Sequence, residues 1–269
     1  MNTPRAPIGV FDSGIGGLTV VAELRRRLPD EGILYLGDTA RLPYGTKSPS
    51  TVFRYTQRNV DFLVAHGVKA VVVACNTASA LALEGLTSPV PVWGVVEPGA
   101  ERAVAASRGR IGVIATASTV ASEAYPRALH RLRHDVEVHS QACPLFVPLV
   151  EEGWLEDAVT EAVARRYLEP LLAARIDTLV LGCTHYPLLA PLLARVAGGA
   201  VTLVDSAESV AATVAAELAR GGALAPAGPP PPDRFCVTDN ADRFARLAER
   251  ILGRPVALEW IDLDLQEAP

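Results

Sequence analysis

Short apolar segments alternate with longer amphipathic segments along the chain. The apolar ones are continuous runs such as Val71-Val72-Val73, which are typical of parallel strands buried on both faces. They predict strands over residues 8–11, 33–36, 70–74, 92–96, 111–115, 136–139, 178–181 and 201–204. Apolar residues at helical spacing predict helices over residues 18–28, 52–66, 120–132, 154–174 and 209–219. This alternation predicts an α/β fold with mostly parallel sheets flanked by helices.

The strand ends come in two similar sets. Residues 8–13 resemble residues 111–116, and residues 71–77 resemble residues 179–184, with Cys75 and Cys183 at matching places. Buried parallel strands draw on the same few residue types, so the apolar part of the likeness is also expected by chance. The shared terminal cysteine favours a duplicated half, and hence two pseudo-symmetric lobes with the active site between them.

The chain after residue 208 predicts a return to the first lobe. Residues 225–232 contain a run of four prolines, which cannot continue a helix and predict an exposed linker. Residues 234–238 and 256–261 predict two further strands around a helix, which we expect to complete the first lobe. The predicted domains are therefore residues 1–97 plus 209–269 for the first lobe, and residues 98–208 for the second.

Composition and charge narrow the class of partner. The chain has 269 residues, of which 49% are hydrophobic, a net charge of -5 and a pI near 5.6. This acidic balance supplies no basic surface for nucleic acid or anionic lipid, and no apolar run has the length of a membrane span or a signal peptide. We expect a cytoplasmic protein with a small-molecule substrate and no nucleic-acid or membrane partner. The oligomeric state stays open, a homodimer being one option.

The four cysteines are widely separated and contain no CxxC pair. Neither a zinc-knuckle spacing nor a small disulfide framework is therefore predicted, and the thiols are expected to be free. Lys47 and Lys69 are the only lysines, which leaves few candidates for a Schiff base.

Polar residues cluster where the first predicted strand ends. Asp12 and Ser13 are followed by Gly14, Gly16 and Gly17, and such glycines let the backbone approach a ligand just before a helix whose N-terminus favours an anion. A substrate carboxylate would suit this place. The segment is no dinucleotide fingerprint, because the third glycine of that motif is missing. Helix capping is the alternative role for Asp12 and Ser13.

Cys75 and Cys183 are the strongest candidates for chemistry. A single free cysteine is often just a small buried hydrophobe, but two thiols at equivalent strand ends suit acid/base catalysis, because one can be a thiolate while the other is a thiol. His185 lies two residues beyond Cys183, and Asp12 ends a strand expected beside the one that leads to Cys75. Each of these two residues could orient or deprotonate its thiol. A zinc site from the two thiols and His185 lacks any metal-like spacing.

Five segments of the chain resemble the signature segments of bacterial glutamate racemases, in the aspartate/glutamate racemase family, and they occur in the same order. They read FDSGIGG at 11–17, GDTARLPYG at 37–45, ACNTA at 74–78, PLVEEG at 148–153 and GCTHYP at 182–187. The resemblance spans nearly the whole chain. It implies two similar α/β lobes, an active site between them, no pyridoxal phosphate, metal or other cofactor, and interconversion of L- and D-glutamate that supplies D-glutamate for peptidoglycan.

The resemblance also implies roles for individual residues. Cys75 and Cys183 match the two catalytic bases, Asp12 the assistant of Cys75, and Glu151 with His185 the assistants of Cys183. Without the resemblance, Glu151 would be expected to be an ordinary surface charge. The positions that match substrate-binding residues are Ser13, Pro43, Tyr44, Gly45, Asn76, Thr77, Thr119 and Thr184.

One segment departs from the family pattern. Ala115 and Ser118 stand where the family usually has glycine, and a side chain there is expected to narrow the approach of the backbone to the substrate near Thr119. Two other functions remain open at this point: a racemase for another acidic substrate such as aspartate, and a binding protein whose lobes clamp a dicarboxylate. Paired thiols argue against the second, because a clamp has no use for them.

Overall fold

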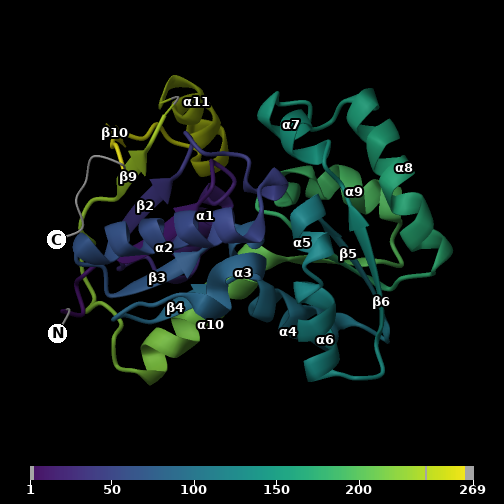
Figure 1. Ribbon diagram of the computed structural model, residues 1–269, viewed down its shortest axis with the longest axis horizontal. Coiled ribbons are helices and arrows are strands. Elements are labelled where there is room, and N and C mark those ends of the chain that lie inside the picture. The colour runs from purple at the N-terminus through teal and green to yellow at the C-terminus, as the bar shows by residue number, and fades with distance from the viewer. Residues whose placement is uncertain (1–2, 240, 264–269) are drawn as a thin grey trace.

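The protein consists of two α/β lobes that lie side by side (Figure 1), in a computed structural model that describes residues 3–239 and 241–263. The first lobe is built on a parallel sheet with the strand order β10-β9-β2-β1-β3-β4. Its strands are β1 Ile8–Asp12, β2 Ile33–Gly37, β3 Ala70–Val73, β4 Val92–Gly94, β9 Arg234–Val237 and β10 Leu258–Trp260. β9 and β10 extend this sheet beyond β2, as predicted.

The second lobe repeats the central part of the first. Its parallel sheet has the order β6-β5-β7-β8, which matches β2-β1-β3-β4 strand for strand. The strands are β5 Arg110–Ala115, β6 Glu137–Ala142, β7 Thr178–Gly182 and β8 Thr202–Asp205. The predicted α/β class and pseudo-symmetric lobes are confirmed, and β3 and β7, the strands that lead to the two cysteines, occupy equivalent places.

Helices cover both faces of each sheet. In the first lobe Val72 belongs to the core under α1 and α10, whereas its neighbours Val71 and Val73 belong to the core under α2. Successive strand residues thus bury on opposite faces, which is why these strands are apolar throughout. The α-helices are α1 Leu18–Arg27, α2 Pro49–Ala65, α3 Asn76–Ala82, α4 Val96–Ala106, α5 Ala117–Ala121, α6 Ala124–Leu132, α7 Phe146–Glu151, α8 Ala158–Ala173, α9 Ala190–Ala197, α10 Ser206–Arg220 and α11 Ala241–Leu252, and the 3₁₀ helices are η1 Tyr44–Thr46, η2 Leu83–Gly85 and η3 Tyr186–Leu189.

Several helices differ from the prediction. The single helix expected over 120–132 is divided into α5 and α6, with Glu123 in the left-handed region at φ 54° between them. Pro126, in the first turn of α6, has no amide hydrogen to extend α5, so a new helix starts. α8 begins at Ala158, later than expected, because Asp157 caps it through the Val159 amide. The helix α4, of 11 residues, and the shorter helices α7 and α9 were not predicted.

The proline-rich segment that follows α10 has the form of the predicted linker. Residues 225–232 form neither helix nor strand and are exposed or half-buried, as predicted. The domain limits at 97/98 and 208/209 stay a prediction. Within residues 3–239 and 241–263, no helix is long and apolar enough to cross a membrane.

Candidate active site

The two predicted catalytic cysteines lie on one cavity between the lobes. Cys75 follows β3 and is the N-cap of α3, and Cys183 follows β7 directly. Both are free thiols and both are 5% exposed. They line the same cavity of about 160 Å³, so the carboxyl ends of equivalent strands from the two lobes face a common space.

Cys75 is held as a thiol. Its Sγ donates a hydrogen bond to Ser13 Oγ at 3.4 Å. Burial, and after it the nearby Asp12 carboxylate, raise the pKa of Cys75 to about 12, while the Ser13 contact opposes the change. At neutral pH this cysteine therefore carries its proton and can act as an acid.

Asp12 supports this side of the cavity from behind the lining residues. It ends β1, which pairs with β3, so its predicted place beside the strand leading to Cys75 is confirmed. Its carboxylate accepts hydrogen bonds from the Gly14 amide at 2.9 Å and from Thr184 Oγ1 at 3.3 Å. Burial raises the pKa of Asp12, which makes a protonated, hydrogen-bond-donating form more accessible than for an exposed aspartate.

Cys183 has a different environment. His185 Nδ1 lies 3.9 Å from the Cys183 sulfur, and His185 Nε2 lies 3.1 Å from Glu151 Oε1. Burial lowers the pKa of His185, but contacts with Cys183 and Glu151 outweigh this and raise it to about 10. His185 is therefore an imidazolium at neutral pH and places a positive charge beside the Cys183 sulfur. Glu151, the last residue of α7, faces the site and is not an ordinary surface charge.

Most of the predicted substrate-binding residues line the cavity. These are Ser13, Pro43, Tyr44, Gly45, Asn76, Thr77 and Thr184. Thr119 differs, because it is 2% exposed and is not among the lining residues. Its hydroxyl instead contacts Thr77 Oγ1 at 3.3 Å and Thr116 Oγ1 at 2.9 Å.

Thr116 takes the lining position that was expected for Thr119. It is the N-cap of α5 and its hydroxyl lies 3.0 Å from that of Thr77. Sequence reasoning missed Thr116, although a signal existed: Thr116 follows β5 as Ser13 follows β1, and β1 and β5 are equivalent strands. The pseudo-symmetry thus places two hydroxyl residues at matching points of the cavity wall.

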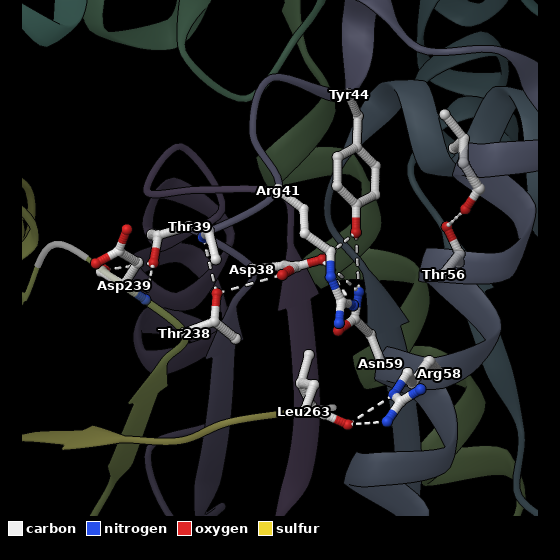
Figure 2. A network of polar contacts seen from close by, with 12 residues as sticks. Asp38, Thr39, Arg41, Tyr44, Thr56, Arg58, Asn59, Thr238, Asp239 and Leu263 are labelled. Atoms are coloured by element: carbon white, nitrogen blue, oxygen red, sulfur yellow. Dashed lines mark hydrogen bonds and ion pairs between the residues drawn. The ribbon is translucent and has the colours of Figure 1, made fainter. Parts of the chain in front are cut away.

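A buried carboxylate fixes the loop that carries Pro43, Tyr44 and Gly45. Figure 2 shows Asp38 between Thr238 on one side and Tyr44 with Asn59 on the other. Its oxygens accept hydrogen bonds from Thr238 Oγ1 at 3.2 Å, from the Tyr44 hydroxyl and from Asn59 Nδ2 at 3.4 Å. Asp38 is 0% exposed, and a buried carboxylate is stable only with such partners. Sequence reasoning missed this role, because two of the partners, Asn59 and Thr238, are 21 and 200 residues away along the chain.

The side chains at the two departures from the family pattern do not line the cavity. Ala115 is fully buried and pairs with Gly182 on the neighbouring strand, and Ser118 is half-buried. The Ser118 hydroxyl donates a hydrogen bond of 2.6 Å to the carbonyl of Gly45 in the other lobe. Neither side chain therefore blocks the substrate directly, and the effect of the two residues on its approach stays a prediction.

Further hydrogen bonds join the lobes around the cavity. Thr19 Oγ1, in α1, donates to the Thr184 carbonyl at 3.3 Å. The Tyr125 hydroxyl, in α6, donates to Asn76 Oδ1 at 2.7 Å. These contacts place Thr184 and Asn76 against the opposite lobe, so the cavity wall is continuous across the boundary.

Helix N-termini contribute to the cavity. α3 begins at the lining residue Asn76, and α5 begins at Ala117, directly after Thr116. Beyond Thr184 the chain forms the 3₁₀ helix η3 before α9, and after Ser13 the helix α1 starts only at Leu18. The first turn of a helix presents free amides and a partial positive charge, so the termini of α3 and α5 suit a carboxylate ligand.

In the part of the chain that the structure describes, no group of three or more His, Cys, Asp or Glu side chains is placed to hold a metal ion.

The similarity of this chain to known proteins identifies its family. The model of the Asp/Glu/Hydantoin racemase family matches residues 15–214. A glutamate racemase of Neisseria meningitidis is 54% identical over 261 residues, covering 96% of each chain. Among solved structures, a glutamate racemase isoform from Bacillus anthracis has a TM-score of 0.94 at 41% identity, covering 98% of this chain and all of that chain. The glutamate racemase of Francisella tularensis in complex with D-glutamate has a TM-score of 0.91 at 38% identity, covering 97% and 99%. With its two cysteines at equivalent strand ends on one cavity, this chain belongs to the Asp/Glu/Hydantoin racemase family and, within it, to the glutamate racemases.

Proposed function

We propose that this glutamate racemase interconverts L- and D-glutamate by using Cys75 and Cys183 as two acid/base groups on opposite faces of the α-carbon. The observation that carries the proposal is that two buried free thiols, at equivalent strand ends of two similar lobes, line one small cavity. A reaction between mirror-image molecules needs equivalent groups on two sides, and the duplicated lobes supply them.

In the direction from L- to D-glutamate, the Cys183 thiolate removes the α-proton. The Cys75 thiol then donates its own proton to the opposite face of the α-carbon. The products are D-glutamate, a Cys183 thiol and a Cys75 thiolate, and proton exchange with solvent restores the first state. In the reverse direction Cys75 takes the proton from D-glutamate and Cys183 returns one.

The assistants differ between the two sides. The imidazolium of His185, paired with Glu151, stabilises the Cys183 thiolate before abstraction. Asp12 serves Cys75, since a carboxyl group whose pKa is raised by burial can donate a hydrogen bond when Cys75 must become a thiolate. The two thiols therefore have different surroundings: Cys75 is held as a thiol, and Cys183 lies beside the imidazolium of His185, which is the arrangement proposed to act on L-glutamate.

The α-carbanion is the difficult species, because it forms beside a charged carboxylate. Hydroxyls of Ser13, Thr77 and Thr184, together with the first amides of α3, are proposed to hold the two carboxylates. Well-aimed donors of this kind contribute about 3 to 4 kcal/mol each to transition-state stabilisation in other enzymes. Backbone groups of Pro43, Tyr44 and Gly45, with Asn76, complete the proposed substrate site. Thr119 acts on the substrate through its contacts with Thr77 and Thr116.

The cellular role follows from the family. We propose that D-glutamate made in the cytoplasm by this protein is used for peptidoglycan synthesis, and that residues 1–97 with 209–269 and residues 98–208 act as the two lobes of the site. Assembly into a homodimer is compatible with this proposal.

The direct test is circular dichroism of L-glutamate incubated with the purified protein and no added cofactor. The signal should decay to that of a racemic mixture, and aspartate should remain unchanged. In deuterated water the product enantiomer should acquire deuterium while unreacted substrate stays mostly protiated at early times, because the donating thiol has exchanged with solvent. Deuterium in both enantiomers from the start would contradict two separate bases, and activity only with added pyridoxal phosphate or metal would contradict the proposed chemistry.

A further inference from the structure

Residues 43–45 form the loop that lines the cavity from the first lobe. The carbonyl groups of this loop accept two local hydrogen bonds and one from the other lobe. The Pro43 carbonyl accepts from Thr46 Oγ1 at 3.2 Å, and the Tyr44 carbonyl accepts from the Lys47 amide at 3.1 Å, so both bonds are local. The Gly45 carbonyl accepts from Ser118 Oγ at 2.6 Å, and Ser118 belongs to α5 of the second lobe. One serine thus ties this loop to the opposite wall of the cavity.

Gly45 lies directly against α5 at this place. A Cβ on Gly45 would lie 2.9 Å from the Cβ of Thr116, so no side chain fits between the two residues. Gly45 and Thr116 both line the cavity, and they form one of the points where the walls of the two lobes meet. The Ser118 hydrogen bond lies at this junction without reaching into the cavity itself.

The Ser118 hydroxyl is directed away from its own helix. Ser118 is the second residue of α5, where no earlier turn offers it a carbonyl, whereas Ser122, the C-cap of the same helix, donates to the Thr119 carbonyl at 2.7 Å. Ser118 instead donates across the lobe boundary, and its 2.6 Å bond is at the short end of the range for hydroxyl donors. Ser122 is therefore a natural control for the loss of a hydroxyl that acts within one lobe.

We propose that Ser118 is a positioning residue for substrate binding, whose hydroxyl holds the Gly45 backbone of the first lobe against α5 of the second and so sets the width of the cavity at this junction. The inference rests on the proposed function, because the Gly45 backbone is part of the proposed glutamate site. Ser118 itself touches neither the substrate nor the thiols. Its effect is transmitted by the loop.

This role predicts a particular kinetic signature. The loop contacts the carboxylates in the ground state and in the transition state alike, so loosening it removes uniform binding and raises KM more than it lowers kcat. Loss of one net hydrogen bond of ordinary strength corresponds to a rise in KM of roughly 3- to 10-fold. The rise should be similar for both enantiomers, because the equilibrium between them makes kcat/KM equal in the two directions and kcat is expected to change little.

The experiment compares Ser118→Ala, Ser118→Thr and Ser122→Ala with the unchanged protein. Alanine is a better helix former than serine, so Ser118→Ala is expected to fold. We expect Ser118→Ala to raise KM for L- and D-glutamate with little change in kcat, Ser118→Thr to restore KM because it keeps the hydroxyl, and Ser122→Ala to leave KM unchanged. Calorimetric titration of D-glutamate into the Cys75→Ser variant, with and without Ser118→Ala, should show the same loss of affinity.

The outcomes separate the two proposals. If the unchanged protein racemises glutamate but Ser118→Ala leaves KM and the D-glutamate affinity as they were, the role of Ser118 is overturned and the proposed function stands. A fall in kcat without a rise in KM, or a failure of threonine to restore KM, also overturns it. Unchanged protein that neither racemises glutamate nor binds D-glutamate overturns the proposed function, and the substrate role of Ser118 with it.

Discussion

Gly16 of the first lobe packs against Thr184 of the second with no room for a side chain: a Cβ on Gly16 would lie 2.3 Å from Thr184 Oγ1 and 2.6 Å from His185 Nδ1. Thr184 is at the same time bonded to Asp12, so this glycine is where the assistants of both thiols come together. The close approach explains why a residue outside the cavity lining should matter for activity.

Gly16→Ala is expected to reduce kcat/KM strongly, because the added methyl group displaces Thr184 and His185. Overpacking of this kind typically costs about 1 to 3 kcal/mol in stability. Gly199→Ala is the control, since a Cβ on Gly199 has no neighbouring atom within 4 Å. Steady-state kinetics and thermal unfolding of both variants provide the measurement. Equal activity in the two variants would contradict this prediction, because it would mean that a Cβ on Gly16 does not displace Thr184 and His185.

Replacing either catalytic cysteine should abolish racemisation and leave one half of the chemistry intact. Cys75→Ser and Cys183→Ser should each lose at least about 100-fold in racemisation, because a serine hydroxyl is too weak an acid to supply the required anion near neutral pH. With a glutamate analogue that carries a leaving group on the β-carbon, abstraction alone leads to elimination. Cys75→Ser should then process the L-configured α-carbon and Cys183→Ser the D-configured one. If both folded variants process the same enantiomer, the assignment of faces is wrong.

Asp12→Asn and His185→Asn should affect opposite proton abstractions. Asp12 serves Cys75, which acts on D-glutamate, whereas His185 is 3.9 Å from the sulfur of Cys183, which acts on L-glutamate. Overall rates in the two directions are tied by the equilibrium, so they cannot separate these roles. Primary isotope effects with α-deuterated D- and L-glutamate can. The effect should grow for D-glutamate in Asp12→Asn and for L-glutamate in His185→Asn and Glu151→Gln, and identical effects in all three variants would remove the division of labour.

The raised pKa of His185 predicts how stability depends on pH. Its pKa is about 10 in the folded protein and 6.5 for the free side chain, so the folded state binds the proton more tightly. The stabilisation is fully present below pH 6.5 and is lost as the pH rises towards 10. The free energy of unfolding, measured by urea titration across this range, should therefore fall more steeply for the unchanged protein than for His185→Asn. Parallel curves for the two proteins would contradict the charged His185–Glu151 pair.

The sequence by itself determined the features that depend on neighbouring residues. Continuous runs such as Val71-Val72-Val73 are typical of strands covered on both faces. The succession of strands along the chain and the α/β class were therefore predictable. Cys75 and Cys183 directly follow such strands, and His185 is two residues from Cys183. Positions this close in the chain are fixed by local geometry once the strand is known.

Only the tertiary structure decided which distant side chains meet. Glu151 reaches His185 across 34 residues, and Ser118 reaches Gly45 across 73. Such contacts depend on how the elements pack. The position of Thr116 as N-cap of α5 places it on the cavity while Thr119 lies behind it, and the contacts of Asp38 with Asn59 and Thr238 had no signature in the sequence.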